Sequence, residues 1–355
     1  MALTKITATD ALAQLNTFNT IIDARSESEY ALDRLPGAAN WPTLNNQERH
    51  AVGTEYKQVS AFDARKRGAV MAARNIARHI ETHCADKPKG WKPLVYCWRG
   101  GQRSGSLSLV LSQIGFDVHI IDGGYKAFRA EMVIDTARLA TIFDYRVICG
   151  PTGSGKTRLL TSLAAAGAQV LDLEALAEHR SSVLGLIPGQ PQPSQKHFDT
   201  RIWDALRKLD PSHVVWAESE SKKVGNVSVP DALMTALRAS HCARLELPVE
   251  ERVKLLMEDY DFFVKDPVFF CERLDVLKDL RGNAVIDDWK ARVHAGLVEG
   301  VVRELLEIHY DPGYASSTRR NYQQFDASYV IATGSRADLS ERSFSQNLIA
   351  AIAAP

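Results

Sequence analysis

The stretch Val95-Tyr-Cys-Trp-Arg-Gly-Gly-Gln-Arg-Ser104 joins a short apolar run to a cysteine, two glycines, two arginines and a helical pattern. Residues 93–96 predict a buried strand, and we expect a helix from about Ser104, whose side chain can cap it. The two glycines let the chain turn tightly with its N–H groups pointing inward. In α/β proteins ligands bind at the carboxyl ends of parallel strands, so the stretch predicts such a fold with a site at Cys97.

Cys97 is a candidate nucleophile. Inward amides, a helix N-terminus and the guanidinium groups of Arg99 and Arg103 would all favour its thiolate. A structural cysteine at a strand end is the alternative, and the glycines and arginines after Cys97 count against it. The predicted anion-binding loop consists of Trp98, Arg99, Gly100, Gly101, Gln102, Arg103 and Ser104.

The flanking segments extend this unit into a sheet. Residues 20–23 form a β-branched run, and Ser26 with Glu29 makes a capping box for a following helix. Residues 68–84 and 104–114 have helical spacing, and residues 118–121 predict another strand. Alternating strands and helices predict a parallel sheet that is covered on both faces.

Several of these segments together resemble a rhodanese (sulfurtransferase) domain over roughly residues 5–130. The resemblance rests on Asp23-Ala-Arg-Ser-x-x-Glu-Tyr30, Leu35-Pro-Gly-Ala38, the Cys97 loop and Gly123-Gly-Tyr-x-x-Phe128. It implies that Cys97 carries a persulfide or its selenium counterpart, stabilised by the loop amides. The segment 41–70 is longer than a minimal rhodanese needs, and its basic run 64–68 is either specific to a subfamily or a solvated helix start.

Composition limits the class of protein. The chain has 355 residues, enough for two domains, and its 43 basic and 43 acidic residues give no global attraction to polyanions. No signal peptide or membrane-spanning run is evident, so we expect a cytoplasmic protein without membrane contact. Five scattered cysteines argue against disulfides and a zinc ribbon, and His79 with His83 predicts a surface helix rather than a metal site.

A second motif lies beyond a predicted helical connector, residues 131–144. Residues 145–149 predict a strand that leads into a complete G-x-x-x-x-G-K-T phosphate loop (P-loop), and a helix follows over residues 156–166. In this motif backbone amides wrap a phosphate chain, Lys156 supplies a charge and Thr157 is a candidate Mg²⁺ ligand. The predicted phosphate-binding residues are Gly150, Pro151, Thr152, Gly153, Ser154, Gly155, Lys156 and Thr157.

The remainder of the chain predicts a P-loop NTPase-like α/β domain, residues 145–355, with a helical C-terminal part. Residues 169–172 and 212–218 predict strands, and Glu218 and Glu220 are candidate acids or ordinary strand-end carboxylates. Residues 185–194 predict an exposed loop that acts as a lid over the phosphate site. Residues 309–314 predict an aromatic turn, suited to stacking on unpaired nucleobases or equally to packing.

No Asn-Lys-x-Asp signature for guanine is present, and a P-loop recognises phosphate without fixing what the phosphate is attached to. The order of motifs is similar to that of the tRNA 2-selenouridine synthase family over nearly the whole chain. The resemblance adds Gly53-Thr-Glu-Tyr-Lys57, Gln192-Pro-Ser-Gln195, Glu218-Ser-Glu-Ser221, Val224-Gly-Asn226 and Tyr310-Asp-Pro-Gly-Tyr314 to the Cys97 loop and the P-loop.

The resemblance implies a selenotransferase and geranyltransferase that converts 2-thiouridine at the tRNA wobble position to 2-selenouridine. Selenophosphate and geranyl diphosphate are its substrates, S-geranyl-2-thiouridine is the intermediate, and no tightly bound cofactor is expected. The implied partners are the anticodon loop of tRNA and a supplier of selenophosphate. Lys156 and the loop amides would stabilise departing pyrophosphate, and Cys97 would carry selenium or organise selenophosphate.

Two other classes of function stay open from the sequence. An ATP-dependent tRNA sulfurtransferase, or a kinase fused to a rhodanese domain, would use the same P-loop to bind ATP. Rapid ATP turnover stimulated by tRNA would favour that enzyme, whereas release of diphosphate from a prenyl donor favours the selenouridine synthase. A non-catalytic adaptor is the third class, and the intact Cys97 loop and Lys156 speak against it.

Overall fold

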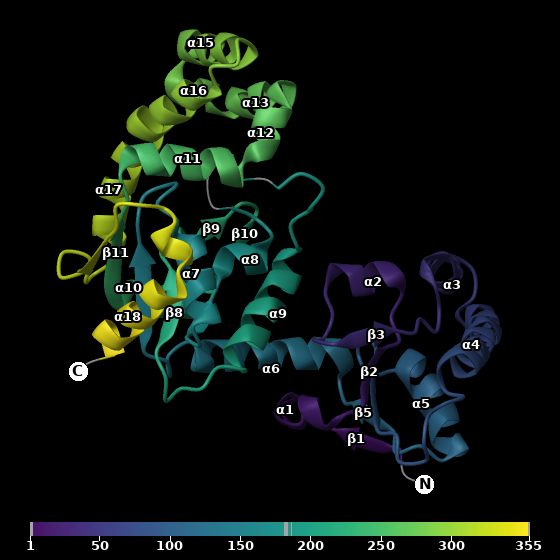
Figure 1. Ribbon diagram of the computed structural model, residues 1–355. Coiled ribbons are helices and arrows are strands. Elements are labelled where there is room, and N and C mark those ends of the chain that lie inside the picture. The colour runs from purple at the N-terminus through teal and green to yellow at the C-terminus, as the bar shows by residue number, and fades with distance from the viewer. Residues whose placement is uncertain (1–2, 181–183, 186, 354–355) are drawn as a thin grey trace. The chain divides into compact units, whose positions relative to one another are not determined.

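The chain folds into two compact units, each built on its own parallel sheet (Figure 1). The computed structural model describes residues 3–180, 184–185 and 187–353. The first unit comprises Met1–Thr136 and Pro193–Asp204, and the second comprises Ala137–Gln192 and Ala205–Pro355. The segment Pro193–Asp204 therefore packs with the first unit although it follows the P-loop in sequence. The division of the sequence at residues 130 and 145 stays a prediction.

The first unit contains a five-stranded parallel sheet in the order β1-β5-β4-β2-β3. Its core gathers Ile22 and Val95 from the strands with Leu107 and Leu111 from the helix after Cys97. The elements are β1 Thr4–Ile6, α1 Ala8–Ala13, β2 Thr20–Asp23, α2 Glu27–Leu32, β3 Ala38–Asn40, α3 Asn46–Gln58, α4 Ala61–His83, β4 Pro93–Tyr96, α5 Gln102–Ile114, β5 His119–Ile121, α6 Gly124–Leu139 and α9 Gln195–Leu206.

The second unit contains a five-stranded parallel sheet in the order β12-β11-β6-β8-β7. Helices α7 and α18 pack on it through Leu159, Leu163 and Leu348. Its sheet elements and their helices are β6 Tyr145–Cys149, α7 Lys156–Ala165, β7 Gln169–Leu171, α8 Leu173–Ala177, β8 Val215–Glu218, α10 Asp231–Ala239, β11 His241–Glu246, β12 Tyr329–Ala332 and α18 Arg342–Ala353; β9 Lys223–Val224 and β10 Val227–Ser228 form a small separate ribbon.

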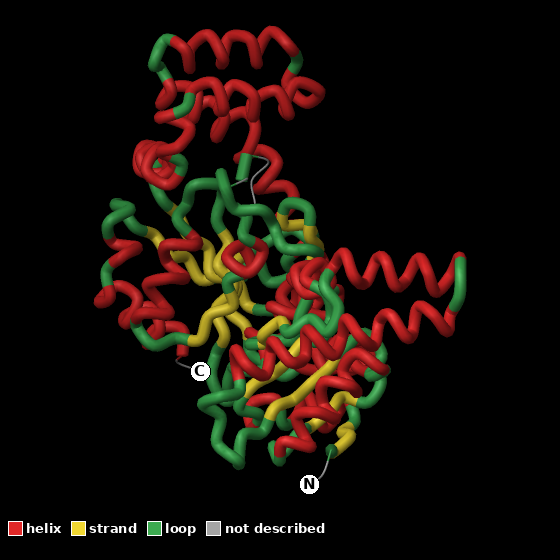
Figure 2. The backbone as a smooth tube through the Cα atoms, turned by 90° about the vertical axis from the view of Figure 1, so that its right-hand side faces the viewer, coloured by secondary structure: helices red, strands yellow, loops and turns green. Residues whose placement is uncertain are grey.

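A helical part extends the second unit beyond the carboxyl end of β11, as the tube in Figure 2 shows in red. Its core contains Phe270, Trp289 and Leu305. It comprises α11 Val249–Asp259, α12 Asp261–Lys265, α13 Pro267–Leu274, α14 Lys278–Arg281, α15 Asn283–His294, α16 Val298–Glu304, the π-helix η3 Leu305–Tyr310 and α17 Asp311–Asn321.

The α/β architecture with two parallel sheets and a helical C-terminal part confirms the fold predicted from the sequence. The Ser26–Glu29 capping box is present, and β4, β6 and α7 lie where they were expected. The helix expected over residues 131–144 begins earlier, at Gly124, and ends at Leu139. Among the described residues, no helix is both long and apolar enough to cross a membrane.

Two local predictions were wrong. Ser104 does not cap α5, because the helix starts at Gln102 with Gly101 at the N-cap and Ser104 lies inside its first turn. Residues 309–314 form no turn, because η3 continues into α17 and the proline occupies the first turn of α17, where it is tolerated. Stacking of nucleobases on an exposed turn at these residues has no structural basis.

Candidate functional site

Cys97 lies at the carboxyl end of the central strand β4, directly before a tight loop. Its side chain is 3% exposed, and the hydroxyl of Ser104 donates a hydrogen bond to its sulfur over 3.1 Å. The sulfur thus accepts a hydrogen bond from the residue that we had expected to act as a helix cap. The N-terminus of α5 adds a positive dipole end a few residues further on.

Gly100 and Gly124 are glycines because the Cys97 loop and the segment 121–124 touch at these positions. A Cβ at Gly124 would lie 2.3 Å from the carbonyl oxygen of Cys97, and one at Gly100 would lie 2.8 Å from that of Ile121. The amide of Tyr125 donates to the Cys97 carbonyl over 2.8 Å. The close approach at Gly123 and Gly124 therefore fixes the backbone conformation of the Cys97 loop.

The two arginines of the loop have different environments. Arg103 donates to both carboxylate oxygens of Glu29, at 2.6 and 3.4 Å. Burial opposes ionisation of Glu29, but the hydrogen bond and charge of Arg103 outweigh it, so the pKa of Glu29 is lowered. Arg103 therefore pairs with Glu29, and its expected effect on the thiol of Cys97 stays a prediction. Arg99 is exposed, so its charge lies in solvent at the loop.

Helix α9 adds residues to the first unit that lie outside the rhodanese-like segment 5–130. The ammonium group of Lys196 lies 5.7 Å from the ring centroid of Trp98, which in turn stacks on Tyr125. His197 faces the buried carboxylate of Asp33 at 3.4 Å, and Arg129 joins Asp33 to Asp199. These contacts place a cation beside the residue that follows Cys97.

The P-loop of the second unit runs from the end of β6 into α7. Gly153 and Gly155 have φ angles of +75° and +88°, and a Cβ at Gly155 would lie 2.3 Å from Leu339 Cδ1. Lys156 donates to the carbonyl oxygen of Gly150 over 2.9 Å, so its ammonium group folds over the loop. The predicted phosphate-binding residues therefore form one cradle of amides at a helix N-terminus.

Arg252 of α11 clamps this loop, although no sequence motif indicates such a role. It is 4% exposed and donates twice to the carbonyl oxygen of Thr152, at 3.1 and 2.7 Å. It also forms a bidentate ion pair with Asp311, at 2.9 and 2.6 Å. The clamp holds the carbonyl oxygen of Thr152, which is an acceptor and does not compete with a phosphate for the amides of the loop.

An acidic cluster lies beside Thr157. One carboxylate oxygen from each of Glu174, Glu218 and Glu220 lies within 4.8 Å of the others. The hydroxyl of Thr157 donates to Glu174 over 3.0 Å. Burial raises the pKa of Glu218 well above its ordinary range, and the charges of Glu174 and Glu220 add to the rise. The cluster unites both predicted acids with Glu174, which the sequence analysis did not single out.

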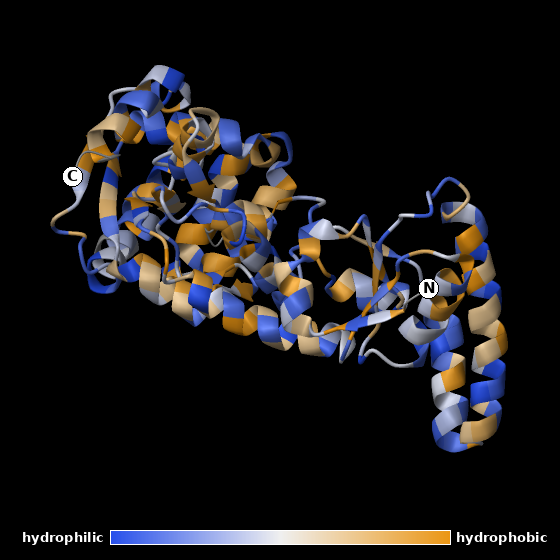
Figure 3. Cartoon of the chain, turned by 90° about the horizontal axis from the view of Figure 1, so that it is seen from below, coloured by the Kyte–Doolittle hydropathy of each residue, from blue (hydrophilic) through white to orange (hydrophobic). Residues whose placement is uncertain are grey.

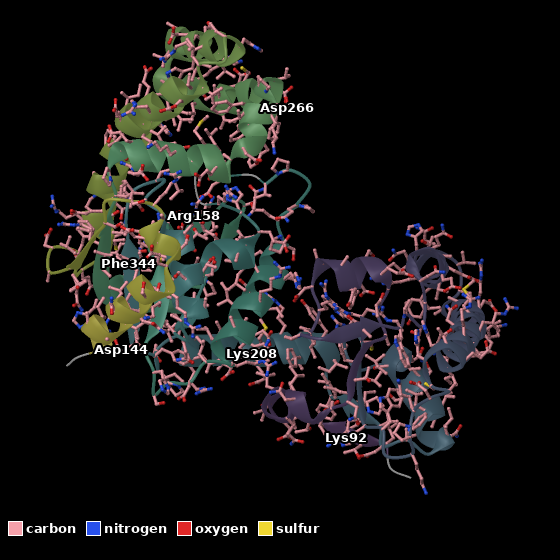
Figure 4. The ribbon with its side chains drawn as sticks, in the orientation of Figure 1. Lys92, Asp144, Arg158, Lys208, Asp266 and Phe344 are labelled. Atoms are coloured by element: carbon pink, nitrogen blue, oxygen red, sulfur yellow. The ribbon has the colours of Figure 1, made fainter. Side chains whose placement is uncertain are left out.

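Two adjoining cavities surround the P-loop. One, of about 500 Å³, is lined by polar groups of the loop and of α7 together with Glu174, Arg180 and Arg342. The other is narrow and apolar, and its walls come from α11, α12, α13, α16 and η3. Leu256 and Tyr260 line both cavities. Arg158, labelled in Figure 4, lies on α7 and pairs with Glu258 and Asp259 of α11, which ties the two helices together beside the phosphate cavity.

Comparison with known proteins identifies both units. Residues 7–131 match the rhodanese-like domain, and residues 143–267 match the tRNA 2-selenouridine synthase AAA domain. A Cronobacter sakazakii protein named tRNA 2-selenouridine synthase is 36% identical over 263 residues, which cover 71% of this chain and 67% of that protein. The chain belongs to the tRNA 2-selenouridine synthase family. A Nitrosomonas europaea protein of the same name is 37% identical over 247 residues.

This member of the tRNA 2-selenouridine synthase family spans 63% of the length of the Nitrosomonas europaea relative, and the match covers 68% of its own chain. Among solved structures, a rhodanese-like domain protein from Staphylococcus aureus is 19% identical, with a TM-score of 0.24, covering 36% of this chain and 91% of that one.

In this family member, the sequence pattern located the Cys97 loop and the P-loop but not the residues from other elements that contact them. A carboxylate after the predicted strand 169–172 was a usable signal for Glu174, because acids at carboxyl ends of parallel strands gather at one edge. Arg252 and Lys196 had no comparable signal, since both act through contacts far away in sequence. The segment 185–194, predicted to be a lid, is a loop in its described residues, and Leu186 lies outside them. The role of this loop as a lid stays a prediction.

Proposed function

We propose that the chain is a tRNA-modifying enzyme that converts wobble 2-thiouridine to 2-selenouridine in the cytoplasm. In this proposal geranyl diphosphate and selenophosphate are its substrates, and S-geranyl-2-thiouridine is the intermediate. The observation that carries the proposal is the pair of adjoining cavities, one lined by the P-loop and the other apolar. A prenyl diphosphate likewise joins a diphosphate group, which would lie at the P-loop, to an apolar chain, which would enter the apolar cavity.

The lining of the apolar cavity suits an isoprenoid chain, and its volume of about 50 Å³ holds only part of a ten-carbon chain, so the walls must move apart when geranyl diphosphate binds. Its lining side chains are aliphatic or aromatic, with Leu256 and Tyr260 at the boundary with the phosphate cavity. Leu305, Leu306 and Tyr310 reach it from η3, and π-helical turns are frequent at functional sites. Burying an apolar chain there is favourable by ~0.8 kcal/mol per CH₂.

In the first step, the sulfur of 2-thiouridine attacks C1 of geranyl diphosphate. The C–S bond forms as the C–O bond to the diphosphate breaks, pyrophosphate leaves with the electron pair, and N3 of the base releases its proton to solvent. Lys156 and the amides of the P-loop stabilise the charge that develops on this leaving group. The sulfur changes from a poor leaving group into a thioether that can depart as a thiol.

In the second step, selenium replaces the alkylated sulfur. Water cleaves the P–Se bond of selenophosphate to give phosphate and hydrogen selenide. The selenide adds to C2 of the base, the C–S bond breaks, and geranylthiol departs with the proton from selenium. The Cys97 loop binds the selenium donor in this proposal, with the Cys97–Ser104 pair at its base.

Magnesium fits the acidic cluster. Glu218 is fully buried, and its Oε2 has no hydrogen-bond partner within the described residues, which leaves an acceptor for a cation. Thr157, Glu174, Glu218 and Glu220 would hold the ion, since Mg²⁺ is bound by carboxylates together with substrate phosphates. A bound ion would neutralise diphosphate charge. Glu218→Gln should raise the Mg²⁺ concentration required for pyrophosphate release.

The test uses purified full-length protein, 2-thiouridine tRNA, geranyl diphosphate and selenophosphate, added singly and together, with nucleosides identified by mass. We expect S-geranyl-2-thiouridine with geranyl diphosphate alone and 2-selenouridine only when selenophosphate is added. Lys156→Ala should abolish the first product, and Cys97→Ser should spare the first and reduce the second. Rapid tRNA-stimulated ATP turnover without geranylation would instead support the ATP-dependent sulfurtransferase or kinase.

A further inference from the structure

A helical hairpin, α3 and α4, interrupts the sheet of the first unit between β3 and β4. The hairpin is visible as two long antiparallel helices in Figure 2, and in Figure 1 it is seen nearly end-on. Its two helices touch closely at Gly68, where a Cβ would lie 3.2 Å from Val52 Cγ1. Asn75 and His79 fix its base by hydrogen bonds to Thr43 and Pro42. Between this base and the connection at residues 59–60, helix α3 buries no residue.

The free end of the hairpin carries exposed apolar side chains. Tyr56 is 54% exposed, Val59 79% and Phe62 65%. Lys66 lies over the ring of Phe62 at 4.8 Å, so a cation and an aromatic face occur together. Three large apolar groups that are mostly exposed at one tip form a contact surface rather than part of a core.

The outer side of the hairpin is basic. Residues 46–83 contain seven Lys and Arg residues against four Asp and Glu, although the whole chain is balanced. Arg67, Arg74 and Arg78 follow each other at spacings of seven and four, which places them on one stripe of α4. The buried Ile76 lies on the opposite side of that helix. Figure 3 shows hydrophilic and hydrophobic positions mixed along these two helices.

Two of these arginines are available to a partner. Within the described part of the chain, neither Arg74 nor Arg78 pairs with a carboxylate, and both are exposed. Arg67 has only an exposed pair with Glu55 at 3.3 Å, which contributes little. A line of arginines leading to an exposed aromatic tip combines phosphate contacts with a surface for an unpaired base.

We infer that the hairpin is an RNA-docking arm that holds tRNA through backbone phosphates on the Arg67–Arg74–Arg78 stripe and an unpaired base at the Tyr56–Phe62 tip. The inference rests on the proposed function for its choice of tRNA. Opposite charge selects a polyanion, and the aromatic tip selects a nucleic acid over an acidic protein. The arm supplies the local basic patch that a chain of zero net charge needs in order to hold tRNA.

The experiment measures binding of 2-thiouridine tRNA to the full chain over a range of salt concentrations. The stripe variant carries Arg67→Gln, Arg74→Gln and Arg78→Gln, and the matched control carries Lys5→Gln, Lys87→Gln and Lys89→Gln from the same unit. Each lost phosphate contact lowers the slope of log affinity against log salt by ~0.7–0.9. We therefore expect the stripe variant to lose about two units of slope and about 10- to 100-fold in affinity near physiological salt.

A tip variant, Tyr56→Ala with Phe62→Ala, should lose affinity for tRNA with no change in the salt slope. Equal affinities and slopes for the stripe variant, the control and the wild type would overturn the inference, and the hairpin would then face a protein partner. If the wild type converts no tRNA but the stripe variant still loses RNA binding, the proposed function fails and the arm stands. If the wild type converts tRNA and the stripe variant matches the control, the arm fails and the function stands.

Discussion

Replacing Arg252 by methionine should loosen the P-loop without altering any residue of the loop. Arg252 is the only contact that we find between α11 and the carbonyl oxygen of Thr152 in the described chain, and it is almost fully buried. Methionine keeps much of the volume and apolar stem of arginine but removes all its donors. The Thr152 carbonyl then loses two donors, and the Asp311 carboxylate loses a bidentate partner.

The expected loss of stability follows from the burial of the two partners. Removing one member of a buried ion pair costs ~3–5 kcal/mol, because the remaining charge stays in a poor solvent. The Asp311 side chain is 32% exposed, so water relieves part of this cost and we expect about 2–3 kcal/mol. We also expect about tenfold weaker diphosphate binding, equivalent to ~1.4 kcal/mol, since the loop must be ordered again when the ligand binds.

The assay combines urea unfolding of the full chain with calorimetric titration of inorganic pyrophosphate. Asp311→Asn separates the two roles of Arg252, because it weakens the ion pair but leaves the bonds to Thr152 in place. Its affinity for pyrophosphate should stay near that of the wild type. Arg303→Met is the matched control, since Arg303 pairs with Glu250 on the exposed surface of the same helical part. Unchanged pyrophosphate affinity in Arg252→Met, or an equal loss in Asp311→Asn, would refute the clamp.

Three other outcomes test the site from different sides. Lys196→Gln should raise the KM for selenophosphate about tenfold with little change in kcat, because it removes a cation beside Trp98; Lys92→Gln, which removes a similar cation from the ring of Phe18, should leave selenation kinetics unchanged. Val302→Trp should fill the apolar cavity and lower kcat/KM for geranyl diphosphate about tenfold or more, while a five-carbon prenyl diphosphate is less affected, as competition kinetics would show. The pKa of Glu29 is lowered in the folded protein, so its ionised carboxylate stabilises the fold at pH values above the ordinary glutamate pKa. This stabilisation is lost as the pH falls through the lowered pKa. Arg103→Gln should therefore make the melting temperature depend less on pH on the acid side.

The parts of the site that sequence predicted are those in which chemistry is local. The P-loop and the Cys97 loop each need glycines, a strand before them and a helix after them, and all of these lie within about fifteen residues. The fold followed from the same patterns, since alternating strands and helices allow few arrangements other than parallel sheets. Glu218 and Glu220 were found because acids after buried strands collect at one edge.

The parts that sequence missed depend on contacts between distant residues. Arg252 and Thr152 are one hundred residues apart, and Lys196 meets Trp98 only because Pro193–Asp204 returns to the first unit. Ser104 was assigned to the wrong role for a related reason, because the helix begins two residues earlier than its pattern suggests. Helix boundaries depend on which cap is better placed in space, and propensity at single positions does not determine that.

The choice between a prenyl diphosphate and ATP depends on the second cavity rather than on the P-loop. P-loops recognise a phosphate chain through amides, one ammonium group and a helix N-terminus, so the motif does not select what the diphosphate is attached to. An adenine placed in the apolar cavity would bury ring nitrogens and an amino group against walls whose only side-chain nitrogen or oxygen atoms, among the described lining residues, are the hydroxyls of Tyr260 and Tyr310. Each unpaired polar group costs ~1–3 kcal/mol, whereas each CH₂ of a prenyl chain gains ~0.8 kcal/mol. The same walls therefore disfavour a nucleobase and favour an isoprenoid, which is why the proposed reaction uses the P-loop without a nucleotide.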